Sequence, residues 1–272
     1  MMSNIFDLSN KVAIVTGGAG ILGRKFCAAL AAQGAKVAAV DINLPDCEAT
    51  INETLINNPD FIIKPFFCDV SKPDSVGNML ENVIDSFGAI DILLNNAASK
   101  TSDLDAFFTP YEEYSINEWR NVMAVNIDGM FLVSQAVGKH LVKRNCGGSI
   151  VQIASIYGVV APDHKIYQGS NYLDRQISTP AVYSASKAAV IGLSKYLASY
   201  WAKKNIRVNS ISPGGVDSGQ NEQFKKLYSE KVPLGRMAHA DDLIGAAIFL
   251  ASDSSGYITG HNLIVDGGFT CW

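Results

Sequence analysis

Short runs of apolar, often β-branched residues recur along the chain and alternate with longer segments whose apolar residues follow helical spacing. Most of the short runs are continuously apolar, which is typical of strands buried on both faces of a parallel sheet. Seven strands are predicted in this way, at residues 12–15, 37–40, 62–67, 90–94, 149–153, 206–211 and 262–265. Helices are predicted between them, notably at residues 22–33, 74–87, 117–141, 182–203 and 241–250.

The alternation of strands and helices predicts βαβ units with right-handed crossovers. We therefore expect a single α/β domain over residues 1–272, in which helices cover both faces of a seven-stranded, mainly parallel, doubly wound sheet. No linker, low-complexity tract or internal repeat divides the chain. At 272 residues, of which 48% are hydrophobic, it can bury a substantial core.

Charge and cysteine content narrow the classes of function. A net charge of −4 without a basic block argues against nucleic-acid and membrane-surface binding as the main role. No apolar run approaches the ~20 residues that span a bilayer, and the start of the sequence shows no signal-peptide pattern. The five cysteines are scattered, and neither they nor the four histidines show metal-ligand spacing. We expect a cytoplasmic protein with reduced thiols and no metal site.

The first predicted strand leads directly into a glycine-rich turn and then into an apolar helix. The turn fits G-x-G-x-x-G and also fits a second spacing with two residues between successive glycines. Glycines there let the backbone approach a pyrophosphate, while the helix N-terminus offers amide groups to the phosphates. The strand–turn–helix context predicts a dinucleotide site of the Rossmann type, with a plain βα turn as the alternative. The cofactor residues expected here are Gly17, Gly18, Gly20, Ile21, Leu22 and Gly23.

Asp41 closes the second predicted strand, eighteen residues after Gly23. A carboxylate at this place accepts hydrogen bonds from the adenosine ribose and repels a 2′-phosphate. No Arg or Lys adjoins Asp41 in the sequence, so NAD is predicted over NADP. A helix-capping role for Asp41 is the alternative.

Further cofactor residues are predicted where later strands end, because ligands of open α/β sheets bind beyond the carboxyl ends of the strands. Asp69 and Val70 follow the third strand, and Asn96, Ala97 and Ala98 follow the fourth. Each of these segments also suits an ordinary turn.

Tyr183 and Lys187 stand four residues apart at the start of a long apolar helix, so their side chains share one face. An ammonium beside a phenol favours the phenolate and lowers the pKa of the tyrosine. Such a tyrosine exchanges a proton with an alcohol or a carbonyl oxygen. Ser155 lies just past the fifth predicted strand, where a capping or turn serine is the alternative. Together with the predicted dinucleotide site, Tyr183 and Lys187 predict a hydride-transfer site.

On residues 16–23, 95–98, Asn126, Ser155 and 183–187, the chain resembles the short-chain dehydrogenase/reductases of the classical type over nearly its whole length. The resemblance implies that Tyr183 is the general acid/base and that Lys187 lowers its pKa and holds the nicotinamide ribose. It implies that Ser155 binds the reacting oxygen and that Asn126 organises a proton-relay water. Cofactor contacts are implied at Pro213, Gly214, Val216 and Ser218. A homotetramer or dimer is implied, with helices 117–141 and 182–203 at one interface.

The chain departs from that family pattern between Ser155 and Tyr183, which stand 28 positions apart, a longer gap than in most classical members. An insertion at about 160–180, pinned at both ends to catalytic residues, is expected at the substrate mouth. It offers His164 and Tyr167 as substrate contacts, and a surface or oligomer-contact loop is the alternative. Residues 218–234 are a possible lid, or a solvated connecting helix. Ile21, Ala98 and Ser218 replace the glycine, glycine and threonine that are usual at their positions.

These observations predict an NAD(P)(H)-dependent oxidoreductase that interconverts a secondary alcohol and a ketone on a sugar-like small molecule. The glycine spacing and the insertion also look similar to dehydrogenases of bacterial nonulosonic, legionaminic-acid-like sugar synthesis. The alternatives are a redox-neutral sugar epimerase or dehydratase with bound NAD, a 3-oxoacyl thioester reductase, and a nucleotide-sensing protein without turnover.

Overall fold

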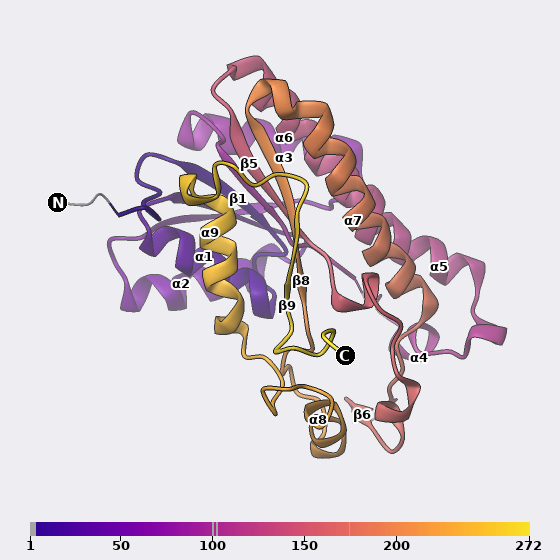
Figure 1. The fold of residues 1–272 in the computed structure, drawn as a ribbon. Coiled ribbons are helices and arrows are strands. Elements are labelled where there is room, and N and C mark those ends of the chain that lie inside the picture. Colours follow the sequence, from indigo (N-terminus) through magenta and orange to yellow (C-terminus); the bar gives the residue numbers. More distant parts are fainter. Residues whose placement is uncertain (1–3, 100, 102, 174) are drawn as a thin grey trace.

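The computed structural model describes residues 4–99, 101, 103–173 and 175–272, and within them a central sheet dominates (Figure 1). Its seven described strands are all parallel and follow the order β3-β2-β1-β4-β5-β8-β9. Their bounds are Val12–Thr16 (β1), Lys36–Asp41 (β2), Ile62–Phe67 (β3), Ile92–Asn95 (β4), Gly148–Ile153 (β5), Ile206–Pro213 (β8) and Asn262–Val265 (β9). The doubly wound sheet predicted from the sequence is therefore confirmed.

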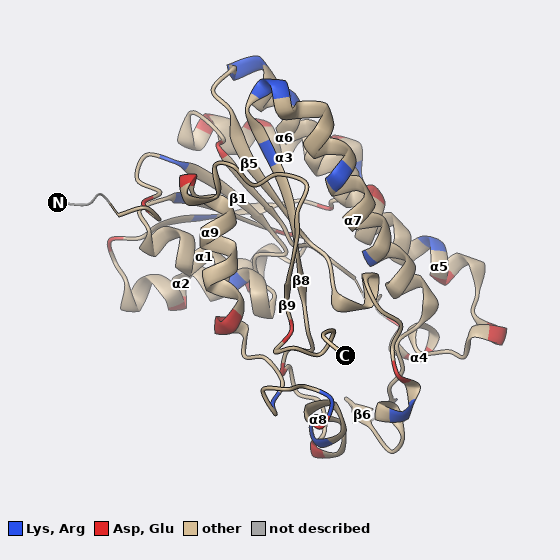
Figure 2. Ribbon diagram, in the orientation of Figure 1, with Lys and Arg blue, Asp and Glu red and all other residues tan. Residues whose placement is uncertain are grey.

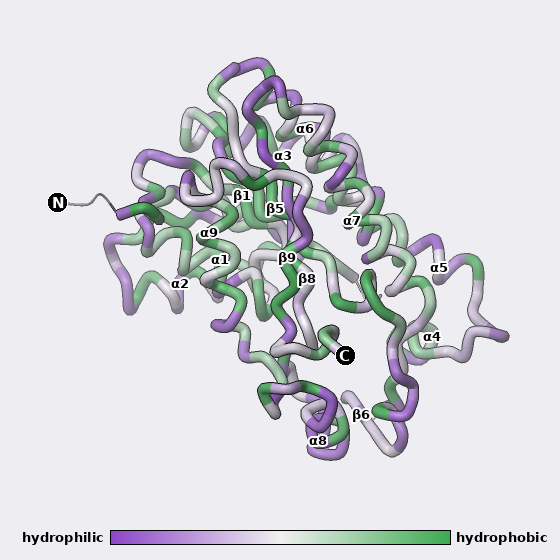
Figure 3. Tube along the Cα trace, viewed as in Figure 1, coloured by the Kyte–Doolittle hydropathy of each residue, from purple (hydrophilic) through white to green (hydrophobic). Residues whose placement is uncertain are grey.

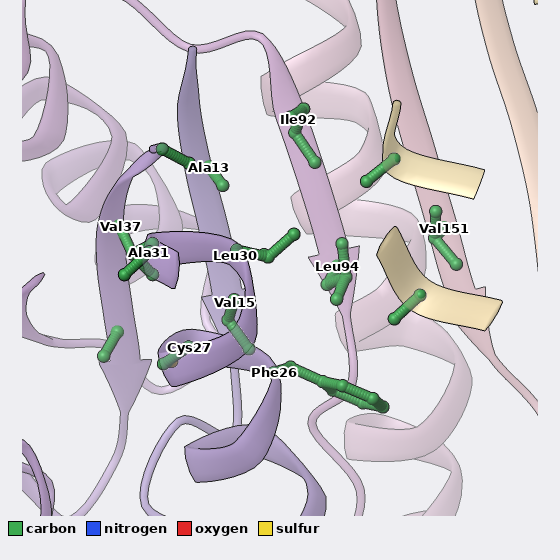
Figure 4. Close-up of a cluster of buried hydrophobic side chains, with 14 of the residues drawn as sticks. Ala13, Val15, Phe26, Cys27, Leu30, Ala31, Val37, Ile92, Leu94 and Val151 are labelled. Atoms are coloured by element: carbon green, nitrogen blue, oxygen red, sulfur yellow. The ribbon is translucent and has the colours of Figure 1, made fainter. Parts of the chain in front are cut away.

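Helices cover both faces of the sheet. The bounds are Ile21–Ala32 (α1), Leu44–Asn57 (α2), Pro73–Phe87 (α3), Leu104–Phe107 (α4), Ile116–Met123 (α5), Met130–Arg144 (α6), Ala181–Trp201 (α7), Glu222–Ser229 (α8) and Ile244–Ala251 (α9). One apolar core lies between the sheet and α1, α2 and α9, and a second lies between the sheet and α3, α6 and α7. Figure 4 shows the first core, where Phe26 and Leu30 of α1 reach toward Ile92 and Leu94 of β4.

The two cores explain why the strands read as continuous apolar runs. Every residue of β1 is buried, because neighbouring side chains point to opposite faces and each face is covered. Figure 3 shows the apolar residues gathered along the central strands, and Figure 2 shows the charged residues spread over the outer helices and loops. No helix among the described residues is long and apolar enough to cross a membrane.

The structure differs from the predicted elements in a few places. The helix expected over residues 117–141 is interrupted by a π-helix, Ala124–Gly129, between α5 and α6. The helix α2 was not among the predicted elements, and β4 begins at Ile92 rather than at residue 90. A short antiparallel hairpin, β6 (Asn171–Tyr172) and β7 (Arg175–Gln176), lies within the insertion.

The insertion packs against α8 at one end of the molecule, where Figure 1 shows β6 beside α8. The Asn221 amide donates to the Asn171 carbonyl at 3.2 Å, and Lys231 forms an ion pair with Asp163. An apolar cluster joins the two segments, and its buried members are Ile156, Ile166, Tyr167, Ile177, Phe224, Tyr228, Val232 and Met237. The insertion and α8 therefore form one roof over the carboxyl end of the sheet.

Candidate active site

A cavity of about 640 Å³ runs along the carboxyl ends of the central strands, on both sides of the point where the strand order reverses between β1 and β4. The predicted site residues that line it are Gly17, Gly20, Ile21, Leu22, Asp41, Asp69, Val70, Asn96, Ala97, Ala98, Ser155, Tyr167, Tyr183, Lys187, Pro213, Gly214, Val216 and Ser218. Four other predicted residues, Gly18, Gly23, Asn126 and His164, lie outside this lining.

The glycine turn needs its glycines for two different reasons. Gly17 has φ +67°, a backbone conformation that L side chains rarely adopt. At Gly23 a Cβ atom would lie 1.9 Å from the Gly17 carbonyl oxygen, so only glycine lets α1 pack against the turn. A Cβ atom at Gly18 would meet Ala39 and Val40 of β2 at 3.1 Å, a tight contact but not an overlap. The helix α1 then begins at Ile21, and Gly20, Ile21 and Leu22 line the cavity, so the amide groups of the first turn of α1 lie at this end of it.

Asp41 holds the end of β2 against this turn. Its carboxylate accepts the Ala19 amide and the Asn43 amide, each at 3.0 Å. Among the described residues that line the cavity, Lys187 is the only basic side chain, and it belongs to the opposite end. The carboxylates of Asp41 and Asp69 thus set the charge of the end nearest the glycine turn.

Thr16, the last residue of β1, connects the glycine turn to β4, a role that we did not predict. Its fully buried hydroxyl accepts the amides of Asn96 and Ala97 at 2.9 and 3.0 Å and donates to Asn95. The Asn96 side chain donates back to the Thr16 carbonyl at 3.0 Å. A threonine that ends a fully apolar strand just before the glycines was the available signal.

Ser155, Tyr183 and Lys187 meet at the far end of the cavity. Ser155 begins a short 3₁₀ turn after β5, and its hydroxyl accepts the Tyr157 amide at 3.2 Å. From α7, the Lys187 ammonium donates to the Ile153 carbonyl at 2.9 Å and lies 5.8 Å from the centre of the Tyr183 ring.

Gly158 explains how the Ser155 turn reaches α7. A Cβ atom at Gly158 would lie 2.6 Å from the carbonyl carbon of Lys187 and 2.7 Å from its oxygen. Only a glycine lets the turn approach the backbone of α7 this closely. This close approach brings Ser155 to Tyr183, and we did not predict it.

The electrostatics of this end correct one prediction. Tyr183 keeps part of its surface open to the cavity, yet burial raises its pKa above the usual value, while the Ser155 hydroxyl acts in the opposite direction. Burial also lowers the pKa of Lys187 from 10.5 to about 8. We expected the ammonium to lower the pKa of Tyr183. In the structure burial outweighs that effect, and the ammonium is directed at the Ile153 carbonyl instead.

Asn126 lies fully buried in the π-helix and connects three segments. Its side-chain oxygen accepts the Ser99 amide at 2.8 Å, and its amide group donates to the Ser186 hydroxyl at 3.3 Å. Ser186 precedes Lys187, so Asn126 fixes α7 beside the segment that follows β4. A π-helix inside a longer helix is frequent at functional sites.

The insertion places only one of its two predicted contacts in the cavity. Tyr167 is buried and lines the cavity, whereas His164 is exposed and lines a neighbouring cavity of about 950 Å³. The structure therefore does not support His164 as a residue of the main cavity. Three further tyrosines that we did not predict, Tyr157, Tyr172 and Tyr228, line the same cavity as Tyr167.

The residues that line the cavity lie within a stretch of the chain that matches a known protein family. A family model described as enoyl-(acyl carrier protein) reductase matches residues 17–270, from the glycine turn almost to the C-terminus. The chain belongs to the short-chain dehydrogenase/reductase family. As a member of that family it is an oxidoreductase that interconverts CH–OH and C=O groups, as the sequence predicted.

Three relatives match this dehydrogenase/reductase over nearly their whole length. D-threitol dehydrogenase of Mycolicibacterium smegmatis is 37% identical over 97% of this chain and 95% of the relative. D-arabinitol 2-dehydrogenase (ribulose-forming) of Candida albicans is 35% identical over 98% of this chain and 95% of the relative. The 2-dehydro-3-deoxy-D-gluconate 5-dehydrogenase of Dickeya dadantii is 34% identical over 99% of both chains.

Solved structures of the family agree with the fold and with a nicotinamide cofactor. A short-chain dehydrogenase from Leptospira borgpetersenii with bound NAD⁺ superposes with a TM-score of 0.85, 32% identity and coverage of 99% and 97%. A gluconate 5-dehydrogenase from Burkholderia cenocepacia in complex with NADP and tartrate superposes with a TM-score of 0.85. It is 29% identical, and the match covers 99% of this chain and 98% of that structure. This dehydrogenase/reductase therefore has relatives with either form of the cofactor.

Proposed function

We propose that this protein is an NAD-dependent dehydrogenase that oxidises a secondary alcohol of a polyol or related sugar to the ketone. One observation carries the proposal. A single cavity joins the glycine turn and Asp41, which suit a dinucleotide, to Ser155, Tyr183 and Lys187, which suit proton exchange with an alcohol.

The proposed chemistry follows from the groups at the far end of the cavity. NAD, when bound, supplies the hydride acceptor. The Tyr183 phenolate takes the alcohol proton, and the Ser155 hydroxyl hydrogen-bonds the reacting oxygen. The Ser155 hydroxyl and the Lys187 ammonium, 5.8 Å from the Tyr183 ring, stabilise that phenolate against burial, which raises the pKa of Tyr183, and the ammonium would hold the nicotinamide ribose. Asn126 organises the proton path, and its bond to Ser186, next to Lys187, supports that role. Ketone reduction uses the same groups in reverse.

The choice of NAD over NADP rests on charge. A 2′-phosphate brings two negative charges toward Asp41, and the described residues that line that end of the cavity include no basic side chain to receive it. The amides at the start of α1 and the close approach allowed by Gly17 fit the pyrophosphate of either cofactor.

The proposed substrate is a neutral polyol. Hydroxyl and amide groups line the far end of the cavity, from Ser178, Thr179 and Gln220 to the tyrosines. Among the described lining residues, Lys187 is the single cation, and its bond to Ile153 directs it away from a carboxylate ligand. The relatives named for D-threitol and D-arabinitol favour the same class. A nonulosonic sugar is the alternative substrate, supported by the glycine spacing and the insertion.

We further propose that the roof formed by the insertion and α8 acts as a lid that excludes water. We also propose a homo-oligomer built on α5, α6 and α7. The exposed rings of Tyr196 and Tyr200, stacked at 5.9 Å on the outer face of α7, support such an interface, and sedimentation tests it. The free thiols support a cytoplasmic location.

The proposed reaction is tested by following NADH formation over polyols, sugars, sugar acids, nucleotide sugars and acyl thioesters. We expect stoichiometric NADH with at least one polyol, whereas release of an isomerised product without NADH would favour the epimerase alternative. Fastest turnover of an acyl thioester would favour the thioester reductase.

Tyr183→Phe tests the acid/base assignment. The variant should still bind NAD, and its kcat should fall by about 10²–10⁴-fold because the proton acceptor is lost. Tyr257→Phe, which removes a hydroxyl from a fully exposed ring outside the cavity, should change neither quantity. A Tyr183→Phe variant as active as the wild type would overturn the assignment.

A further inference from the structure

Three hydroxyl groups form a hydrogen-bonded chain at the substrate end of the cavity. The Tyr167 hydroxyl donates to the Tyr157 hydroxyl at 3.1 Å, and the Tyr167 oxygen lies 2.5 Å from the Thr179 hydroxyl. All three residues line the cavity. Because a phenol carries a single proton, Tyr167 must accept from Thr179 when it donates to Tyr157. The chain therefore runs from Thr179 through Tyr167 to Tyr157.

This direction leaves Tyr157 with a proton for a ligand. The Tyr157 oxygen accepts from Tyr167, and in the described part of the chain no hydrogen bond uses the Tyr157 proton. Burial raises the pKa of Tyr157, so the group stays a donor. Bonds in such a chain polarise one another, which strengthens the last donor. Tyr157 lines the same cavity as Ser155 and Tyr183, and Tyr183 is among the groups that raise the pKa of Tyr157, so this donor lies near the position proposed for the reacting oxygen.

The insertion holds the chain in place. Tyr167 and Thr179 both come from it, and the Tyr167 ring stacks on Phe224 of α8 with 5.6 Å between ring centres. The Tyr157 ring is held by an edge contact with Phe269, 6.5 Å away, near the C-terminus. The donor is therefore fixed before a ligand arrives, which limits the entropy lost on binding.

We propose that Tyr157 binds a second hydroxyl of the substrate, next to the one that is oxidised. This inference rests on the proposed polyol dehydrogenase function and deepens it. A polyol carries a hydroxyl on each carbon, so an acceptor for Tyr157 always lies beside the reacting carbon. Tyr157 is then a specificity-determining residue, and Tyr167 and Thr179 are positioning residues that act through it. The insertion is the element that makes the site selective for a diol over a simple alcohol.

Steady-state kinetics with NAD and the best polyol of the screen, D-threitol included, test the chain. Tyr157→Phe should lower kcat/KM about tenfold, mainly through KM, and should leave the KM for NAD within about twofold. Because Tyr167 acts through Tyr157, the double variant with Tyr167→Phe should be no worse than Tyr157→Phe alone. If the losses of the two single variants add in the double variant, Tyr167 does not act through Tyr157 and only supports the roof. If Tyr157→Phe lowers kcat alone and leaves the KM for the polyol unchanged, Tyr157 does not bind the second hydroxyl.

Matched variants and substrates complete the test. Thr179→Ser keeps the hydroxyl and should behave as the wild type, whereas Thr179→Val should resemble Tyr167→Phe. The wild type should prefer 2,3-butanediol over 2-butanol, which lacks a second hydroxyl, by about tenfold, and Tyr157→Phe should remove that preference. Tyr257→Phe, at a fully exposed tyrosine, is the control. A wild type without activity on any polyol refutes the proposed function, whereas polyol activity and diol preference that Tyr157→Phe leaves unchanged refute this inference alone.

Discussion

Lys187→Met should stabilise the protein at neutral pH while it removes the proposed catalysis. Lys187 is 2% exposed, and its ammonium has one hydrogen-bond partner among the described residues, the Ile153 carbonyl. Burial disfavours the charged form and lowers its pKa from 10.5 to about 8. Methionine fills a similar volume without a charge, so it avoids the desolvation that the amine suffers on folding.

The magnitude follows from that pKa. A tenfold change in proton affinity is worth about 1.4 kcal/mol, so lowering the pKa from 10.5 to about 8 corresponds to about 3 kcal/mol lost by the charged form on folding. Leaving the Ile153 carbonyl without its donor costs about 1 kcal/mol. At pH 7 the variant should therefore exceed the wild type by about 2 kcal/mol in free energy of unfolding.

The difference should depend on pH in a defined direction. Below pH 8 the amine is protonated in both states, and the wild type suffers the full cost. Between pH 8 and 10.5 the unfolded chain binds more protons than the folded one, so the stability of the wild type rises with pH. Above pH 10.5 the cost is gone, and the variant should be about 1 kcal/mol less stable than the wild type because it lacks the hydrogen bond.

Urea unfolding of both proteins at about pH 7 and at about pH 10 measures this change. Lys195→Met, at an exposed position of the same helix, controls for the loss of a lysine and should show no such pH dependence. A Lys187→Met variant that is less stable at pH 7, or a gap that does not change with pH, would refute the reasoning.

Three further predictions concern the glycines and the cofactor. Gly23→Ala should cost about 1–3 kcal/mol of stability and weaken NADH binding in a fluorescence titration, because its Cβ would lie 1.9 Å from the Gly17 oxygen. Gly77→Ala, which meets no atom within 4 Å, should do neither. Asp41→Ala should shift the ratio of kcat/KM values for NADP and NAD by tenfold or more toward NADP, and a wild type that already prefers NADP would contradict the charge argument. Gly158→Ala should lower kcat with little change in NAD affinity, because the added methyl pushes the Ser155 turn away from α7; equal loss of both would point to general unfolding.

Much of the fold was predictable because its determinants are local. A strand buried on both faces must be apolar at every position, so β1 and its neighbours stand out in the sequence. The glycine turn stands out for a similar reason, since a positive φ at Gly17 and a close contact at Gly23 leave few other residues acceptable. The order of such motifs was also enough to identify the family.

The details that escaped prediction depend on contacts between distant segments. Tyr167 faces the cavity because Phe224, 57 residues later, stacks on it, whereas His164 in the same short 3₁₀ segment faces outward. A segment this short has no periodicity from which to read its buried face. The raised pKa of Tyr183 is of the same kind, because it reflects how much protein surrounds the hydroxyl rather than the spacing to Lys187.

The features that cost stability gather where the proposed chemistry takes place. Lys187 is a buried amine, and Asn126 lies in a π-helix. Gly158 has no side chain, which lets the Ser155 turn pack against the backbone of α7. None of these improves the packing of an α/β sheet, and each would be replaced if stability alone mattered. Lys187 belongs to the first turns of α7, which also carry Tyr183, and Asn126 and Gly158 both contact that part of the helix. Their joint effect is to fix a phenol, an amine and the Ser155 hydroxyl around one point of the cavity, which is what a proton-transferring dehydrogenase site requires.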